Sequence, residues 1–480
     1  MPFRRAGCRE HGKFLTQRTV NQGQSEFTAT QPDADDYDRA MAPIPDSERR
    51  PNGAMPDDLV VSLEHLRLVT AEIDDVLKTN RLPAVDLSPE KSTDLGLALL
   101  TIPKISDIAR LLVARVQSQK TTDDAPYPYP QDGPPIDQVI WALRTLFRRR
   151  YAGWNPLLGK NRLVGRVHGV NGIVIHTGEH DPGSNDKPLP PRGTGPGQGV
   201  RVGVIDTGLY PNEWLAGGWV ARYSDLLPSD ANAPMVAGHA TFVTGLILSQ
   251  APGATVEVRR ALNDQGEADS WTVGQEIVRL GRSGIDVLNL SFACYTDDGQ
   301  PPALLATAID RLDPKIVVVA AAGNHADAPL EKTGGVDLRG VPAWPAALED
   351  VIAVGAVDSN GRRAEFSPTA PWVDLYARGV DVRSTYLSQA LTNGESEPTR
   401  FDGWASWTGT SFAAALVSGA IAASTQPGQT TSREAVTDIL ETLAENESYA
   451  VVMDRWHTDL PDRGLARFLN LPAPGDITRP

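Results

Sequence analysis

The sequence predicts an α/β fold, in which a mostly parallel sheet is flanked by helices and is preceded by a smaller, mainly helical N-terminal module. Four short segments rich in branched apolar residues, 200–205, 285–290, 316–321 and 351–357, have the pattern of buried strands. Helical segments separate them, and such alternation is typical of a parallel sheet covered by helices. With 480 residues, 41% of them hydrophobic, the chain is long enough for one large domain and a second unit.

The overall charge argues against nucleic acid as a partner. The net charge is -15 and the pI is near 5.0, whereas a surface that coats nucleic acid needs clustered positive charge. The two cysteines, Cys8 and Cys294, are too few for a disulfide framework or a four-thiolate zinc site. This cysteine content fits a reducing compartment.

Two further features lead us to expect a cytoplasmic protein that does not enter a membrane. The first twenty residues carry several charges and contain no apolar run long enough for the core of a secretory signal. The longest uncharged stretch, 403–432, is interrupted by Pro427 and by several glycines, and its apolar part is shorter than the ~20 residues that a bilayer span requires. We interpret this stretch as a buried helix.

Composition divides the chain into four parts. Residues 1–56 are rich in Gln, Asp, Pro, Arg and Ser, which predicts a disordered tail. Residues 57–180 form the expected N-terminal module. Ten of the nineteen residues in 181–199 are Pro or Gly, which predicts an extended, exposed linker at a domain boundary. The main domain is expected over residues 200–472.

Within the N-terminal module the pattern predicts three helices and a hairpin. Apolar residues at three- and four-residue steps predict an amphipathic helix over 59–76. Similar patterns predict helices around 105–112 and 136–147, the latter after a Pro-Pro pair that can open a helix. The short branched segments 163–167 and 172–176 are separated by an Asn-Gly turn signal, which predicts a hairpin.

Four segments of the main domain carry polar groups suited to catalysis. Asp206 ends the first strand and His239 begins a helix of small residues, while Asn324 follows the third strand and Ser411 begins the uncharged helix. Taken singly, each is more often a turn former, a cap or a structural residue. Taken together, they supply what a serine hydroxyl needs to attack a carbonyl: an imidazole to accept its proton, and a carboxylate to hold the tautomer of that imidazole.

At these four segments the sequence resembles the subtilisin-like serine peptidases (subtilases, peptidase family S8), whose triad occurs in the chain order Asp, His, Ser. The resemblance covers about residues 199–425, and it implies a serine protease whose main domain is a subtilisin-like catalytic domain. It implies that Asp206 orients His239, that His239 is the general base and then the general acid, and that Ser411 is the nucleophile. The Asn324 side chain and the Ser411 backbone N–H would form the oxyanion hole.

The resemblance extends to substrate binding. Ser291, Phe292 and Ala293 resemble the strand that pairs with the substrate backbone, and Gly323 directly precedes the expected oxyanion residue. We therefore expect a protein or peptide substrate that adds to an exposed edge near these residues. No cofactor is needed for this chemistry. Structural calcium occurs in the family, but its ligands cannot be assigned in this sequence, which shows no metal-ligand spacing.

Three positions depart from the family pattern. Phe242 stands where a second His is usual, Ala415 replaces a Pro, and the substrate strand has Phe-Ala in place of Leu-Gly, which adds a methyl group at the subsite. None of these changes removes a catalytic group. Of two nearby residues, Cys294 is expected to be a small buried thiol and His325 a solvent-facing loop residue.

Three functional hypotheses follow. In the leading hypothesis the chain is an intracellular serine endopeptidase, and residues 57–180 are a module that regulates it or recruits a protein partner. In the second, residues 1–199 are a removable pro-region that covers the cleft until the linker is cut. In the third, the chain is a catalytically silent binding or signalling protein that has kept the subtilisin fold.

Overall fold

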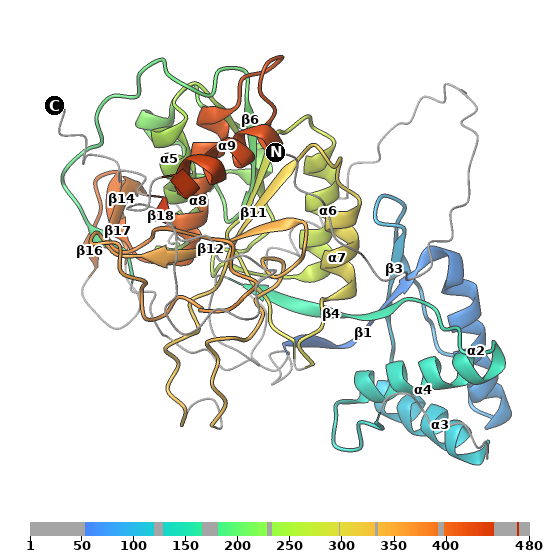
Figure 1. Cartoon of the computed structure of the whole chain (residues 1–480). Helices are drawn as coiled ribbons and strands as arrows, with labels where there is room; N and C mark the ends of the chain where they lie inside the picture. Colours follow the sequence, from blue (N-terminus) through green and yellow to red (C-terminus); the bar gives the residue numbers. More distant parts are fainter. Residues whose placement is uncertain are drawn as a thin grey trace.

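The computed structural model shows a larger part and a smaller N-terminal part that packs against it (Figure 1). It describes residues 53–119, 128–165, 181–227, 233–296, 298–331, 335–391, 398–445 and 468–469. The expected tail, apart from its last residues, and the second strand of the expected hairpin at 172–176 lie outside the described residues.

A parallel sheet of eight strands forms the centre of the larger part. In sheet order the strands are β18 (Phe468–Leu469), β13 (Leu375–Arg378), β12 (Val351–Val357), β11 (Val317–Ala321), β10 (Val287–Leu290), β6 (Arg201–Asp206), β8 (Thr255–Arg260) and β7 (Trp219–Ala221). Every neighbouring pair among them is parallel. The four strands and the fold class predicted from the sequence are therefore confirmed.

Helices cover both faces of this sheet (Figure 1). On one face lie α5 (His239–Gln250), α8 (Thr410–Ser424) and α9 (Ser432–Glu445), and on the other lie α6 (Ser270–Gly281) and α7 (Ala303–Asp310). Successive residues of β11 face opposite cores because strand side chains alternate between the two faces. Burial on both faces explains why these strands are continuously apolar.

The order of the strands places a crevice at one end of the sheet. From β6 the chain moves to β8 on one side and then crosses to β10 on the other side. Such a switch point opens a crevice beyond the carboxyl ends of the strands. Asp206 ends β6, and Ser291 directly follows β10, so two of the predicted site residues lie at this switch point.

The N-terminal module is an antiparallel sheet covered by three helices. Its strands, in sheet order, are β2 (Glu90–Ser92), β3 (Leu97–Thr101), β1 (Ala54–Ser62) and β4 (Leu158–Gly165), and β4 continues onto β9 (Glu267–Asp269) of the larger part. The helices are α2 (Leu66–Thr79), α3 (Ile105–Ser118) and α4 (Pro135–Arg150). The predicted helices at 105–112 and 136–147 are confirmed.

The prediction of a helix over 59–76 is wrong for its first part, which forms strand β1. Leu59 and Val61 pack against the helices of the module, whereas Val60 packs in the apolar core beneath α6 and α7. A strand places successive side chains on opposite faces, so it can bury three consecutive apolar residues between two layers. The same contacts fix the module against the α6–α7 face of the larger part.

Residues 181–199 are mostly exposed and lie along the larger part. Their strand β5 (Gly183–Ser184) pairs with β17 (Trp404–Trp407), which also pairs with β14 (Val382–Thr385). Asn185 Nδ2 donates a hydrogen bond to Ser406 Oγ at 2.8 Å. A second small sheet pairs β15 (Ala390–Leu391) with β16 (Thr399–Arg400).

Gly245 in α5 allows the close packing of that helix on β14, and we predict that Gly245→Ala destabilises the protein by about 2 kcal/mol. A Cβ at this position would overlap with the Ser384 and Thr385 hydroxyls, because it would lie much closer to both than van der Waals contact allows. These hydroxyls donate to carbonyl oxygens of α5 at 2.7 and 2.8 Å, which restricts their movement. Urea denaturation measures the change.

Gly193→Ala is the matched control, since nothing lies within 4 Å of a Cβ built on Gly193. Helix propensity alone would favour Ala at position 245 by roughly 1 kcal/mol. A stabilised Gly245→Ala variant would therefore contradict the proposed packing constraint.

Candidate active site

A buried hydrogen bond joins Asp206 and His239. His239 Nδ1 lies 2.8 Å from both carboxylate oxygens of Asp206, and both side chains are 0% exposed. An ionised carboxylate only accepts hydrogen bonds, so Nδ1 carries a proton, and in the neutral imidazole Nε2 therefore keeps its lone pair. Nε2 accepts no hydrogen bond from any residue that the structure describes.

Thr207 fixes the first turn of α5 relative to the end of β6. Its hydroxyl accepts from Ala240 N at 3.1 Å and donates to Ala237 O at the same distance. Its backbone N–H donates to Asp206 Oδ1 at 2.7 Å. Thr207 therefore holds both the carboxylate and the helix that carries His239, a role that the sequence analysis did not assign.

Aromatic rings surround the imidazole. The Trp407 ring lies 5.6 Å from the His239 ring in an edge-on arrangement, and the Phe412 ring lies 5.5 Å away. Phe242, the residue that departs from the family pattern, packs on Phe412 at 4.6 Å. These apolar neighbours exclude water from His239 and strengthen its interaction with Asp206.

Ser411 lies at the start of α8 and is 1% exposed. Its hydroxyl donates to Ser291 O at 3.3 Å, and the Ser291 hydroxyl donates to Ser411 O at 3.0 Å. The structure thus brings the predicted nucleophile against the predicted substrate strand. The Ser411 hydroxyl is directed at Ser291 and not at His239 Nε2.

Asn324 is held by the residue that precedes Ser411. Asn324 Oδ1 accepts from Thr410 N at 2.9 Å and from Thr410 Oγ1 at 3.0 Å. Thr410 Oγ1 also accepts from Gly323 N at 3.1 Å. Because Oδ1 faces Thr410, the Nδ2 group of the same amide points to the other side.

The prediction of an exposed edge at Ser291–Ala293 is wrong, because these residues are buried and the edge is already paired. Ala293 N donates to Gly165 O at 2.9 Å, and Gly165 N donates to Ala293 O at 3.1 Å. On its other side, residues 163–165 of β4 pair antiparallel with β9. The end of β4 therefore lies between two strands of the larger part.

The predictions made for Cys294 and His325 had different outcomes. Cys294 is buried as predicted, and burial raises the pKa of its thiol to about 12. His325 is 0% exposed, so the prediction of a solvent-facing residue is wrong. Its ring hydrogen-bonds to Tyr295 and to the Val341 carbonyl.

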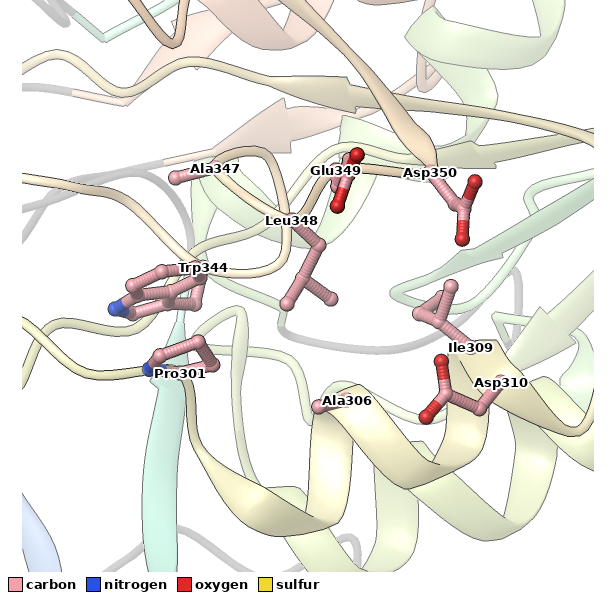
Figure 2. Close-up of a pocket in the computed structure, with 9 residues that line it drawn as sticks. All are labelled: Pro301, Ala306, Ile309, Asp310, Trp344, Ala347, Leu348, Glu349 and Asp350. Atoms are coloured by element: carbon pink, nitrogen blue, oxygen red, sulfur yellow. The ribbon is translucent and has the colours of Figure 1, made fainter. Parts of the chain in front are cut away.

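The pocket in Figure 2 lies apart from these residues and encloses about 390 Å³. Figure 2 shows Asp310 and Asp350 near Ile309 at one end of the pocket, with Trp344 and Pro301 at the other. The residues that line it are Pro301, Ala306, Ile309, Asp310, Trp344, Ala347, Leu348, Glu349 and Asp350. It includes none of the predicted catalytic or substrate-binding residues.

The described part of the chain contains neither a candidate metal site nor a candidate membrane span. Across the described ranges, no three His, Cys, Asp or Glu side chains gather in a way that could hold a metal ion. Among the described helices, none is both long and apolar enough to cross a membrane. The structure therefore offers no carboxylate cluster to which calcium ligands can be assigned.

Comparisons with known proteins agree with the fold and with the Asp206–His239 pair. The model of the subtilase family matches residues 197–467, which is more than half of the chain. The chain therefore belongs to the subtilase family, and it is a serine protease.

Two subtilisins are similar to this chain in sequence. Subtilisin DY from Bacillus licheniformis is 32% identical over 265 residues, which cover 52% of this chain and 85% of the relative. Subtilisin Savinase from Lederbergia lenta is 31% identical over 217 residues, which cover 42% of this chain and 73% of the relative. The match to the family model begins at residue 197, after the N-terminal module.

Proposed function

We propose that the chain is an endopeptidase that cleaves peptide bonds through an acyl-enzyme intermediate. Ser411 Oγ attacks the scissile carbonyl, and His239 Nε2 accepts the hydroxyl proton and later gives it to the leaving amine. Asp206 holds the imidazole in place and stabilises its charged form. Water then hydrolyses the ester on Ser411 by the same route, which restores the hydroxyl.

The Asp206–His239 hydrogen bond is the observation that carries this proposal. It leaves a lone pair on Nε2, the atom that must accept a proton. The Ser411 hydroxyl makes a 3.3 Å bond to Ser291 O, which is long for a hydroxyl donor. Rotation about the Cα–Cβ bond would redirect it, and catalytic hydrogen bonds often tighten only when substrate is bound.

The placement of Asn324 supports its role in the oxyanion hole. Thr410 fixes Oδ1 of the amide, so the Nδ2 group is the part that would donate to a developing oxyanion. Ser411 lies in the first turn of α8, where backbone N–H groups have no partner within the helix. The amide, the Ser411 N–H and the positive end of the helix dipole would act on the same oxygen.

We further propose that the N-terminal module controls access to this site. Residues 163–165 of β4 lie between β9 and Ala293 as an extended peptide, and this is where the substrate backbone is expected to pair. A peptide substrate could pair with Ala293 only after this segment has moved. In this proposal, residues 1–199 keep the protease inactive until the connection is cut or displaced.

Polar contacts support a specific docking of the module on the larger part. Asn161 Oδ1 accepts from Trp271 N at 3.0 Å and from Ser270 Oγ at 3.1 Å, so it caps the first turn of α6. An ion pair of 2.7 Å joins Asp94 to Arg282 at the other end of α6. These contacts attach the module to both ends of α6, next to the end of β4 that pairs with Ala293.

Three expectations from the sequence stay predictions. They are a cytoplasmic location, structural calcium, and recruitment of a protein partner by residues 57–180.

We predict that the wild-type chain hydrolyses a fluorogenic peptide library, and that Ser411→Ala reduces this activity to background. Asn324→Ala should lower kcat by about 10²- to 10³-fold and leave KM nearly unchanged, because the amide acts mainly on the transition state. Labelling with a fluorophosphonate probe, followed after prolonged incubation, should occur in wild type and disappear in Ser411→Ala. If the chain were a catalytically silent binding protein, neither wild type nor Ser411→Ala would be labelled. That result would contradict the proposal.

Control by the module can be tested at Gly165, where we predict that Gly165→Pro raises the initial peptidase rate of the full-length chain. Proline has no N–H and cannot donate to Ala293 O. Gly165→Ala is the matched control, because its N–H is retained and the nearest atom to an added Cβ is 3.7 Å away.

Mass spectrometry provides the second readout. Wild type should yield a stable fragment that begins between residues 166 and 200, whereas Ser411→Ala should stay full length. Full-length wild type under active conditions, combined with equal initial rates for the two Gly165 variants, would contradict control by the module.

A further inference from the structure

Two buried side chains behind the Gly323–Asn324 loop are not used by the mechanism described above. His325 directly follows Asn324, and its ring lies edge-on to the Tyr295 ring, with 4.8 Å between the ring centroids. Both side chains are buried, His325 completely. Burying polar groups costs free energy unless each group is hydrogen-bonded. We therefore asked which hydrogen bonds hold the His325 imidazole between a phenol and a carbonyl.

The hydrogen bonds of His325 define its protonation. His325 Nε2 lies 3.0 Å from the Val341 carbonyl, which can only accept, so Nε2 carries the proton. Nδ1 then accepts from the Tyr295 hydroxyl at 3.0 Å. Burial lowers the pKa of His325 to about 4, and burial raises the pKa of Tyr295, so both groups stay neutral at ordinary pH.

Both partners of His325 belong to the chain segments that form the substrate strand and its neighbour. Tyr295 lies two residues after Ala293. Val341 lies three residues before Trp344, whose backbone pairs with Cys294 in both directions at 2.8 and 2.9 Å. His325 therefore connects the oxyanion loop to the strand that is expected to hold the substrate.

Contact with the loop is direct. Gly323 has a φ of +108°, a conformation that favours glycine. A Cβ on Gly323 would lie 2.5 Å from His325 Nδ1 and 3.1 Å from the Tyr295 hydroxyl. The Tyr295–His325 pair thus packs against one side of Gly323, while Thr410 holds the loop from the other side.

We propose that Tyr295 and His325 are positioning residues that hold the Asn324 amide at a fixed distance from the substrate strand. This inference rests on the proposed role of Asn324. The pair acts through the loop, since neither ring nitrogen of His325 is left to contact a substrate or leaving group. Small displacements of a catalytic group can cost large factors in rate, so loss of the clamp should affect the transition state more than substrate binding.

The test is Tyr295→Phe, which removes only the hydroxyl that bonds to His325. In the full chain, after activation and with active sites titrated, we expect kcat to fall about 10- to 100-fold with KM changed less than about twofold. The same change in an Asn324→Ala background should have less than about a twofold further effect, because the amide that it positions is already absent.

Thr296→Val is the matched control. Thr296 directly follows Tyr295, and the bond that its hydroxyl accepts, from Trp344 Nε1 at 3.1 Å, does not involve the Gly323–Asn324 loop. We expect its kcat to match wild type. His325→Gln can still donate to Val341 O and accept from Tyr295, so it should keep about tenfold more kcat than His325→Ala. If Tyr295→Phe does not fold, the comparison of His325→Gln with His325→Ala tests the inference instead.

Several results would overturn the inference. They are an unchanged kcat in Tyr295→Phe, an effect confined to KM, the same fold-change in the two Asn324 backgrounds, or equal kcat in the two His325 variants. Failure of the proposed function is distinguishable, because in that case wild type itself would have no peptidase activity.

Discussion

The buried hydrogen bond between Asp206 and His239 is the constraint on which the rest of the site depends. It joins the end of a central strand to the start of a helix, and Thr207 fixes both at this junction. The buried Asp206 carboxylate depends on this bond, because burying a charge is costly unless the charge is paired or hydrogen-bonded. The parallel sheet matters for function because its switch point brings these groups to one crevice.

Because His239 and Ser411 are buried, the position of the N-terminal module matters for substrate access. With His239 and Ser411 almost completely covered, a peptide can reach them only if something moves. The end of β4 is the segment paired at the substrate edge, and it belongs to the module. Packing of Val60 into the core beneath α6 and α7 connects this segment to the stability of the whole chain.

Much of the larger part could be predicted from the sequence because its signals are local. Continuous apolar runs predicted β6, β10, β11 and β12, and the turn before Ser411 predicted the start of α8. Pairing between distant segments has no such signal. Leu59 fits a helical spacing with Leu63 and Leu66, and only the pairing of β1 with β3 and β4 makes it part of a strand.

In the site, too, local features could be predicted from the sequence, whereas contacts between distant residues could not. The types and chain order of the four polar residues predicted the chemistry, but nothing near Ala293 in the sequence indicates that Gly165 pairs with it. His325 appeared to belong to an exposed loop because its partners, Tyr295 and Val341, are 30 and 16 residues away. Trp407 is distant from His239 in the chain and carries no motif, so its contact with the imidazole could not be predicted.

The most direct measurement of the central claim is the location of the proton on the imidazole of His239. Proton–nitrogen NMR of the chain labelled at histidine, with His239→Ala to assign the signals, compares wild type with Asp206→Asn. The account predicts a strongly downfield Nδ1–H signal and no proton on Nε2 in wild type, with the downfield signal lost in Asp206→Asn. A proton on Nε2 and none on Nδ1 in wild type would contradict it, because that imidazole could not accept the proton of a serine.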